Sequence, residues 1–368
     1  MPRCISLLWL GIGIAGLAGC GGAADSSGPV VRVYNWSDYI AEDVISEFEA
    51  ETGIDVVYDV FDSNEVLEAK LLSGASGYDV VVPTSDFLGR QILAGVFQKL
   101  DRDKLSNYSN LDPELMELMT SYDPGNQYAV PYLWGTTGLG YNADMVTARL
   151  GGEPIESIAV LFDPEYLARL ADCGVAVVDA PSEVFPAVLN YLGYDPNIQD
   201  AELYKTVARD TLLAIRPYIL YFHSSQYIND LANGDICFVF GWSGDILQAK
   251  ARAEEAENGV NIEYVIPREG ALLWVDTLAI PVGARNPDNA HRFIDYLLRP
   301  DVIAAISNYV QYANGNAASR SLLDPAVLND PGIYPPPPVR AKLFANKVTP
   351  PRLDRVATRV WTQVKTGL

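Results

Sequence analysis

Apolar runs alternate with helix-like segments through the first third of the chain. Each predicted helix ends at or near a glycine, a residue that readily closes helices. Three strand–helix units within about seventy residues predict a mostly parallel sheet covered by helices. The predicted strands are 30–34, 55–61 and 78–82, and the predicted helices are 41–51, 64–72 and 86–93.

This alternation breaks at 128–141, where Pro131 and several glycines interrupt a β-rich run. We interpret the run as a crossover between two lobes. Alternation resumes over 164–257 and is followed by a β-rich stretch at 260–282 and a helical stretch at 286–310. The sequence therefore predicts an α/β protein with a ligand cleft between two lobes, at the carboxyl ends of the strands.

The crossover also predicts how the chain divides. Near the end, the prolines at 335–338 predict extended chain, and 353–364 predicts an amphipathic helix. The first lobe is expected to contain 30–134 and 251–301, and the second lobe 135–250 and 302–368.

The first twenty residues have the features of an export signal. Arg3 supplies a positive charge, and residues 5–17 are a largely apolar run, shorter than the roughly 20 residues that span a bilayer. The run ends in small residues before Cys20, which resembles the lipobox of bacterial lipoproteins. We therefore expect a signal peptide at 1–20, a lipid on Cys20 and a flexible tether at 21–29. An ordinary signal peptide cut nearby is the alternative.

The composition of the chain limits the kinds of molecule that it is expected to bind. The chain carries 47 acidic and 26 basic residues, for a formal net charge of −21. Such a surface repels nucleic-acid backbones and concentrates small cations, although any soluble acidic protein shares it. Outside the first twenty residues, the cysteines are Cys173 and Cys237. In an exported chain they favour a disulfide, and two buried thiols are the alternative.

Three of the five tryptophans after the leader are followed closely by an aspartate. Residues i and i+2 of a strand share a face, which would put an indole ring beside a carboxylate. The third pair spans a strand-to-helix turn that contains glycines. The pairs are Trp36 with Asp38, Trp274 with Asp276, and Trp242 with Asp245.

A ring beside a carboxylate suits an alkylammonium ion. The carboxylate accepts its N–H donors, while the ring covers the methylene chain and attracts the cation by roughly 0.5–2 kcal/mol. Carboxylates at both ends of an aromatic box would select a diamine by length. Tryptophans also fill cores and aspartates also cap helices, so each pair alone is compatible with a purely structural role.

Catalytic signatures are scarce in this sequence. It lacks the G-x-S-x-G, H-E-x-x-H and P-loop motifs. Of its two histidines, we expect His223 to be structural and His291 to be exposed. The cysteine pair is typical of a disulfide, which disfavours a zinc site. Together with the missing motifs, this leads us to expect no catalytic activity, no metal and no cofactor. Binding of a sugar or an amino acid, glycoside hydrolysis and surface sensing are the alternatives. The first two are disfavoured by the clustered carboxylates and by the lack of an arginine in the tryptophan–aspartate motifs.

Several segments resemble the periplasmic polyamine-binding proteins of bacterial ABC importers. The most specific contain NWSDYI (35–40) and FHSSQYINDLANGDI (222–236), and VPYLWGTTGLGYN (130–142) adds to them. The likeness extends over essentially the whole chain after the leader and is greatest for the putrescine-type branch. It implies the type II periplasmic binding protein fold, with mixed sheets flanked by helices and an amine held between hinged lobes. It further implies a periplasmic monomer that delivers a polyamine to a membrane permease.

The resemblance also assigns residues by position. It supports the Cys173–Cys237 disulfide. Carboxylates would bind amino groups, Glu183 through water, while Trp242 and Trp274 would sandwich the methylene chain. The expected ligand-binding residues are Trp36, Ser37, Asp38, Thr84, Asp86, Glu183, Ser224, Trp242, Asp245, Trp274, Asp276 and Tyr312.

Two positions depart from the putrescine-binding pattern. Trp274 stands where putrescine-preferring members tend to carry phenylalanine, and Asp86 stands where relatives carry serine or tyrosine. An added carboxylate at the pocket mouth could bind a third ammonium group, which favours a triamine such as spermidine. Asp86 could equally cap its helix. Putrescine, spermidine and agmatine therefore all remain candidate ligands.

Overall fold

The computed structural model describes residues 28–74 and 76–368. The predicted signal peptide, Cys20 and nearly all of the tether lie outside these residues. Within the described part of the chain, no helix is both long and apolar enough to cross a membrane.

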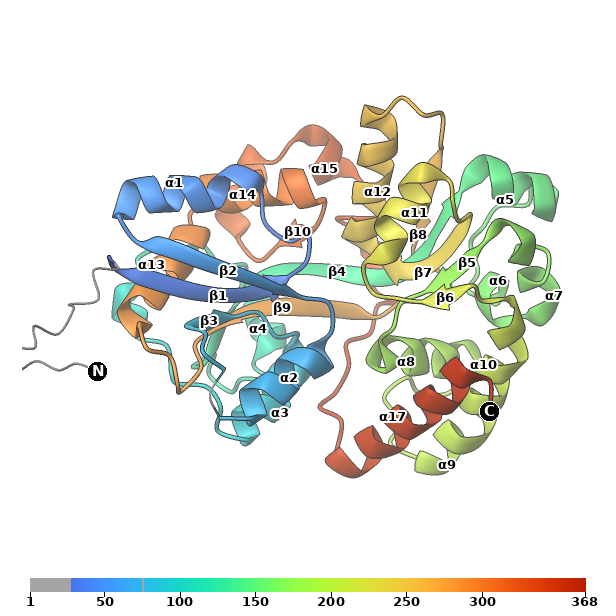
Figure 1. The fold of residues 1–368 in the computed structure, drawn as a ribbon, viewed down its shortest axis with the longest axis horizontal. Coiled ribbons are helices and arrows are strands. Elements are labelled where there is room, and N and C mark those ends of the chain that lie inside the picture. Colours follow the sequence, from blue (N-terminus) through green and yellow to red (C-terminus); the bar gives the residue numbers. More distant parts are fainter. Residues whose placement is uncertain (1–27, 75) are drawn as a thin grey trace, which may run out of the picture.

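The first three strand–helix units form as predicted (Figure 1). β1 pairs with β2 and β3 in parallel, which places their carboxyl ends at the same edge of the sheet. α1 ends at Gly53, whose φ of 66° is left-handed, and the Ser63 side chain caps α2. The elements are β1 Val30–Trp36, α1 Glu42–Thr52, β2 Asp55–Phe61, α2 Asn64–Leu72, β3 Val80–Val81 and α3 Ser85–Leu93.

Later segments complete the first lobe. The helical stretch predicted at 286–310 forms two helices, divided at Pro300, because proline starts a helix more readily than it continues one. The short helices α4 and α15 fall in segments without a predicted element. These elements are α4 Pro113–Met119, β9 Leu273–Ala279, α13 Pro287–Leu297, α14 Pro300–Val310, β10 Ala313–Asn314 and α15 Pro325–Asn329.

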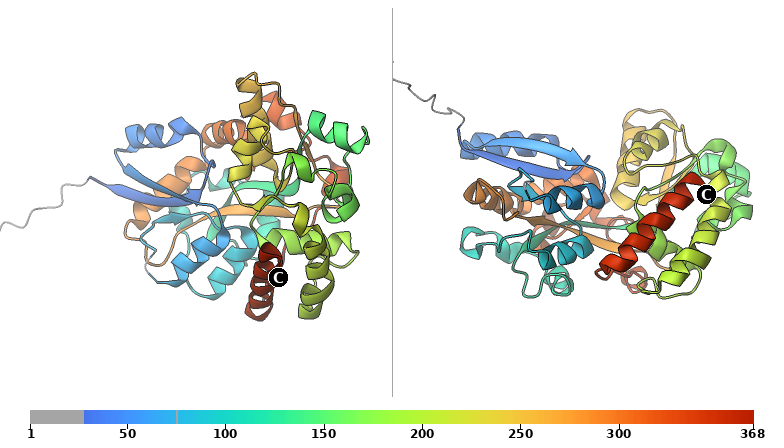
Figure 2. Two further views of the ribbon diagram at one scale, coloured as in Figure 1. Left: turned by 45° about the vertical axis from the view of Figure 1, so that its right-hand side comes forward. Right: turned by 60° about the horizontal axis from the view of Figure 1, so that its bottom comes forward.

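The second lobe also alternates strands and helices. Its central strands β5 and β7 run parallel, and helices cover both faces of the sheet (Figure 2). The elements are α5 Ala143–Leu150, α6 Ala159–Phe162, α7 Pro164–Leu167, β5 Val175–Val177, α8 Pro181–Tyr191, α9 Ala201–Leu203, α10 Arg209–Ile215, β6 Tyr221–Phe222, α11 Gln226–Asn233, β7 Phe238–Trp242, α12 Ser243–Glu255, β8 Ile262–Val265 and α17 Pro351–Thr366. The short helix α16 Pro337–Arg340 lies against the first lobe, where Arg340 pairs with Glu114 of α4.

One long strand, β4 (Ala129–Asn142), joins the lobes (Figure 1). Its first half pairs with β9 and β10, and its second half pairs with β7 and β8. The strand order is β2-β1-β3-β9-β4-β7-β5-β6, so one sheet runs through both lobes. The predicted crossover is therefore a continuous strand, and the glycines expected to interrupt it lie within the strand.

Packing of the hydrophobic cores corrects the predicted division of the chain. Val302 and Ile303 of α14 lie in the core of the first lobe, although 302–368 was assigned to the second. Ala253 of α12 packs with the second lobe, although 251–301 was assigned to the first. α17 packs in the second lobe as predicted, through Trp361 among others. Sequence patterns locate elements, but the choice between two adjacent cores depends on tertiary packing.

Two local predictions are wrong. His291 is buried, with Nε2 accepting a hydrogen bond from the Asp101 amide, because α13 turns this face toward the 101–104 turn. Pro337 starts the short helix α16, whereas extended chain was predicted at 335–338. His223 has the structural role expected of it, since its Nδ1 accepts hydrogen bonds from two amides at the start of α11.

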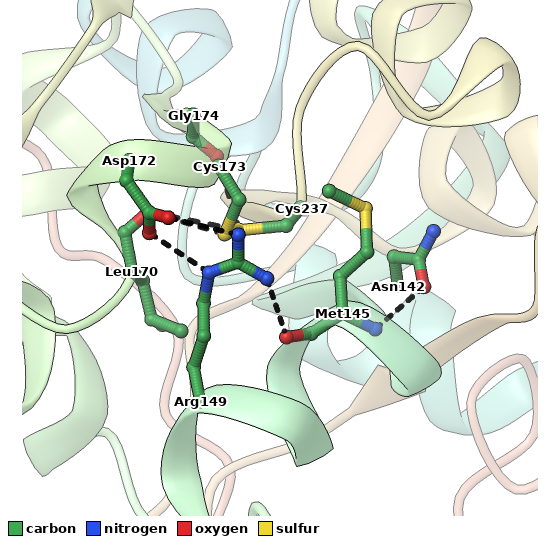
Figure 3. The surroundings of a disulfide bond; sticks show 8 residues. All are labelled: Asn142, Met145, Arg149, Leu170, Asp172, Cys173, Gly174 and Cys237. Carbon is green, nitrogen blue, oxygen red and sulfur yellow. Dashed lines mark hydrogen bonds and ion pairs between the residues drawn. A yellow bond between two sulfur atoms is a disulfide. The ribbon is translucent and has the colours of Figure 1, made fainter.

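The Cys173–Cys237 disulfide is present, with the Cα atoms 5.5 Å apart (Figure 3). Cys173 lies just before β5 and Cys237 just before β7, and these strands are neighbours, so the bridge joins two adjacent strand starts. Arg149 and Asp172 form an ion pair beside it.

Replacing both cysteines with serine is expected to lower the free energy of unfolding by about 4 kcal/mol, because the bridge closes a long loop in the unfolded chain. The cysteines are 64 residues apart. Urea unfolding of the oxidised protein and the double variant would measure the difference. Dithiothreitol should lower the stability of the wild type and leave the variant unchanged. Equal stability of all four samples would contradict the prediction.

Candidate ligand-binding site

A cavity lies between the two lobes, with an empty volume of about 460 Å³ including its mouth. Ten of the predicted binding residues line it, and Asp38 and Asp86 do not. The lining residues are Trp36, Ser37, Tyr39, Phe61, Asp62, Asn64, Thr84, Glu183, Ser224, Ser225, Ile228, Trp242, Asp245, Trp274, Asp276 and Tyr312.

Aromatic rings from both lobes form much of the wall. Trp36 ends β1, and its Nε1 donates a hydrogen bond to the Val82 carbonyl at 3.0 Å, which fixes the ring. Its ring meets that of Trp242 edge to face, with centroids 5.5 Å apart. Trp274 meets Tyr312 in the same way at 5.4 Å. Rings held in this manner can enclose an alkyl chain and attract a cation to their faces.

Asp276 supplies a buried carboxylate from β9. Tyr39 Oη donates to its Oδ2 at 2.7 Å, and Thr84 Oγ1 donates to its Oδ1 at 2.6 Å. Asn64 holds the Thr84 hydroxyl in turn, at 2.8 Å. Burial raises the pKa of Asp276 to about 7, and the two hydroxyl bonds oppose that rise.

Asp245 lies in the first turn of α12 and has a matching arrangement. Tyr312 Oη donates to Oδ1 at 2.6 Å, and Tyr227 Oη donates to Oδ2 at 2.7 Å. Burial raises its pKa to about 7, against the effect of both hydroxyls. Asp245 packs with the second lobe, and Asp276 with the first, so the two carboxylates face the cavity from different lobes.

Glu183, near the start of α8, is a third buried carboxylate. Its Oε2 accepts a hydrogen bond from Thr137 Oγ1 at 2.5 Å. Burial, together with nearby Asp86 and Asp276, raises its pKa to about 8. Among the residues that the structure describes, Glu183, Asp245 and Asp276 form no ion pair. Three buried carboxylates without a protein cation make the cavity suitable for a cationic ligand.

Nothing in the described ranges favours a metal as that cation. No group of three or more histidine, cysteine or acidic side chains there is placed to hold a metal ion. The aromatic walls also suit an organic cation better than a hydrated inorganic one.

Comparison with known proteins places the chain in a family. The model for bacterial extracellular solute-binding proteins matches residues 43–335. The chain belongs to this family. Its curated relatives include the putrescine-binding periplasmic protein PotF of Escherichia coli, 57% identical over 92% of this chain and 91% of PotF. They also include the putrescine-binding periplasmic protein SpuD of Pseudomonas aeruginosa, 52% identical over 97% of each chain.

A solved structure supports the same assignment. The putative spermidine/putrescine ABC transporter protein of Listeria monocytogenes has a TM-score of 0.82 and 32% sequence identity, over 92% of this chain and 99% of that chain. The resemblance to polyamine-binding components of ABC importers and the two-lobed fold are thus confirmed. The family is one of solute-binding proteins, and PotF and SpuD are named as periplasmic proteins.

In this solute-binding protein, Asp38 does not line the cavity, and its contact with a ligand stays a prediction. Its backbone has a φ of 53°, and its carboxylate binds Arg252 Nη2 at 2.7 Å. Arg252 lies on α12 of the second lobe. The alternation rule does not apply here because the left-handed residue turns the chain just after β1 ends. Asp38 instead links the two lobes by an ion pair.

Asp86 also lies outside the main cavity. It faces a neighbouring cavity between the lobes, with an empty volume of about 610 Å³, that Arg90 and Asn346 also line. Burial raises the pKa of Asp86 to about 6, and Arg90 opposes the rise. Because Asp86 in turn raises the pKa of Glu183 and Asp276, it lies close to the main site without lining it.

Sequence reasoning included Thr84 and Tyr312 but missed the other two hydroxyl groups that hold Asp276 and Asp245. Tyr39 and Tyr227 are both within segments that carry the family resemblance, but a tyrosine in such a segment gives no sign of its partner. Asn64 acts on a cavity carboxylate through Thr84, and Thr137 bonds the Glu183 carboxylate directly. Their partners lie 20 and 46 residues away along the chain, so no local spacing indicates them.

Proposed function

We propose that this protein binds a polyamine in the interlobe cavity and delivers it to the permease of an ABC importer. The observation that carries the proposal is the set of three buried carboxylates, without a protein cation, inside an aromatic enclosure. The relatives named for putrescine support it, because the likeness extends over nine-tenths or more of each chain.

A polyamine matches this chemistry group by group. Its ammonium ends would neutralise carboxylates that burial otherwise makes costly to ionise, and its methylenes would lie against the tryptophans. Asp276 and Asp245 face it from different lobes, so one diamine would contact both. Ligand binding would then stabilise the closed arrangement, which a permease could recognise.

The ion pair between Asp38 and Arg252 is proposed to add to closure. Both side chains are about one-third exposed, at 39% and 35%. Exposed ion pairs contribute about 0.2–1 kcal/mol, so Asp38→Asn should weaken binding by no more than about fivefold. Titration calorimetry at two salt concentrations measures this. The double variant Asp38→Arg/Arg252→Asp should recover part of the loss, whereas a loss that persists in it would indicate direct ligand contact by Asp38.

The neighbouring cavity favours a longer ligand. Asp86 there could take a third ammonium group, so we propose that spermidine binds at least as well as putrescine. Replacing Asp86 with serine should then weaken spermidine binding and leave putrescine binding nearly unchanged. Equal effects on both amines would instead assign Asp86 to the structure of α3.

A binding panel tests the function itself. Calorimetry with putrescine, spermidine, agmatine, arginine and a disaccharide should give tight binding to one or more polyamines, and chromatography should recover the amine unchanged. Binding of the disaccharide without an amine signal would overturn the proposal.

We also propose that the protein is a periplasmic monomer anchored by a lipid on Cys20. Globomycin, which blocks lipoprotein processing, should leave the precursor uncut in cells. The Cys20→Ser variant should move from the membrane fraction to the soluble fraction. An unchanged membrane fraction would contradict anchoring at this residue.

A further inference from the structure

Thr137 lies on β4 where that strand passes from one lobe into the other. Thr137 is buried, with 2% of its surface exposed, and it does not line the cavity. The hydroxyl has two partners, since it accepts from Trp274 Nε1 at 3.2 Å and donates to Glu183 Oε2 at 2.5 Å. An indole N–H can only donate and an ionised carboxylate can only accept, so both directions are fixed when Glu183 is ionised.

Gly135 complements Thr137 from two positions earlier on the same face of β4. It lies opposite Trp274 in the antiparallel register with β9. A Cβ atom at Gly135 would lie 2.8 Å from Trp274 Cζ2 and 2.8 Å from Ser243 Oγ. Glycine is therefore required here for space. We call Gly135 and Thr137 together the indole cradle: one residue leaves room for the ring and the other binds its nitrogen.

The two groups that Thr137 joins come from different parts of the fold. Trp274 is on β9, whose neighbours β3 and β4 belong to the first-lobe part of the sheet. Glu183 is on α8 in the second lobe, and both side chains line the cavity. A single hydroxyl on the connecting strand thus fixes an aromatic wall and a carboxylate relative to each other.

We propose that Thr137 is a positioning residue of the ligand site, which sets the ring plane of Trp274 and the orientation of the Glu183 carboxylate without touching the ligand. The inference rests on the proposed binding of polyamines in this cavity. If Thr137 has this role, the geometry of the site depends on β4, the strand that joins the lobes, as well as on the residues that face the ligand.

Electrostatics gives this role a measurable signature. Burial is the main cause that raises the pKa of Glu183, and the nearby carboxylates Asp86 and Asp276 add to it. The Thr137 hydroxyl is the largest opposing influence on that pKa. Without it, the carboxyl group would hold its proton to higher pH, and a protonated carboxyl is a poor partner for an ammonium group.

Thr137→Val tests the proposal, because valine has the same shape and suits a strand. The dissociation constant for putrescine or spermidine is expected to rise about tenfold at pH 7, the effect of losing a hydrogen bond to a charged group. The midpoint of the affinity–pH profile should move to higher pH. Thr137→Ser should restore both values to near wild type.

Thr136→Val is the matched control. Thr136 is equally buried on the same strand, but its hydroxyl pairs with Tyr264 Oη at 2.8 Å, and Tyr264 does not line the cavity. This variant should bind as the wild type does, with an unchanged pH midpoint. Thermal melting of all variants would separate positioning from loss of fold, and Thr137→Ala would replace the valine variant should that variant melt early.

A double-mutant cycle isolates the indole contact. Trp274→Phe removes the N–H donor, so Thr137→Val should cost less in that background than in the wild type. Wild-type affinity for Thr137→Val at every pH, or no rescue by serine, would overturn the assignment of Thr137. Failure of the wild type to bind any amine would instead overturn the proposed function, so the two results are distinguishable.

Discussion

Replacing Asp276 with asparagine is expected to raise the dissociation constant for putrescine or spermidine at least about tenfold, since hydrogen bonds that involve a buried charge contribute roughly 1.5–3 kcal/mol. Asp276 is 4% exposed and already holds two hydroxyl donors. A bound ammonium group can therefore interact with this charge, whereas solvent has little access to it. Titration calorimetry of the wild type and the variant at pH 8 measures the change.

Two controls support the interpretation of that variant. Asp288→Asn removes an exposed carboxylate that pairs with Lys104, and should leave ligand affinity unchanged. The folded-state pKa of Asp276, about 7, lies above that of an unfolded aspartate, so its ionisation opposes folding as the pH rises toward 8. Asp276→Asn should therefore melt no lower than the wild type at pH 8 without ligand. An unchanged dissociation constant in a folded variant would remove Asp276 from the site.

The second large effect is on pH dependence. Burial raises the pKa values of Asp245 and Asp276 to about 7 and that of Glu183 to about 8. Alkylammonium groups resemble lysine, with a pKa near 10.4, so the ligand stays charged throughout this range. Protons and ligand therefore compete for the same oxygens. Affinity is expected to fall from pH 8 to pH 5.5 by at least roughly thirtyfold if one carboxylate must ionise, and by more if two must.

Proton release provides an independent measurement of this competition. Binding at pH 6.5 should release protons to the buffer, so the apparent enthalpy should depend on the ionisation enthalpy of the buffer. Asp276→Asn should release fewer protons than the wild type. A constant affinity between pH 5.5 and pH 8, with equal heats in all buffers, would show that these carboxyl groups do not meet the ligand charges.

Local patterns in the sequence were sufficient for much of the fold. β2 and α2 have the predicted bounds because their strand pattern and capping signals agree with their tertiary setting. β4 was predicted as an interrupted run because glycines usually weaken strands. Within the structure, those glycines provide room for the side chains of neighbouring elements: a Cβ at Gly135 would meet Trp274, and one at Gly140 would meet Ile246.

The sequence predicted which residues form the site better than it predicted how their side chains are oriented. Alternation along a strand correctly directed Trp274 and Asp276 to one cavity. The rule does not apply to Asp38, which lies after the end of β1 with a left-handed backbone and does not line the cavity. The hydroxyls around the carboxylates could not be predicted, since Tyr39 meets Asp276 from 237 residues away. Such contacts result from the final packing of the chain.

The unbroken β4 strand has a consequence for the energetics of capture. Two bodies joined by a loose linker would explore many relative orientations, and a ligand bridging them would have to offset that lost freedom. Here one strand of fourteen residues is hydrogen-bonded to the first lobe along one half and to the second lobe along the other, so relative motion of the lobes must bend or twist that strand. The entropy left to lose on ligand uptake is correspondingly small, and more of the contact energy is retained as affinity.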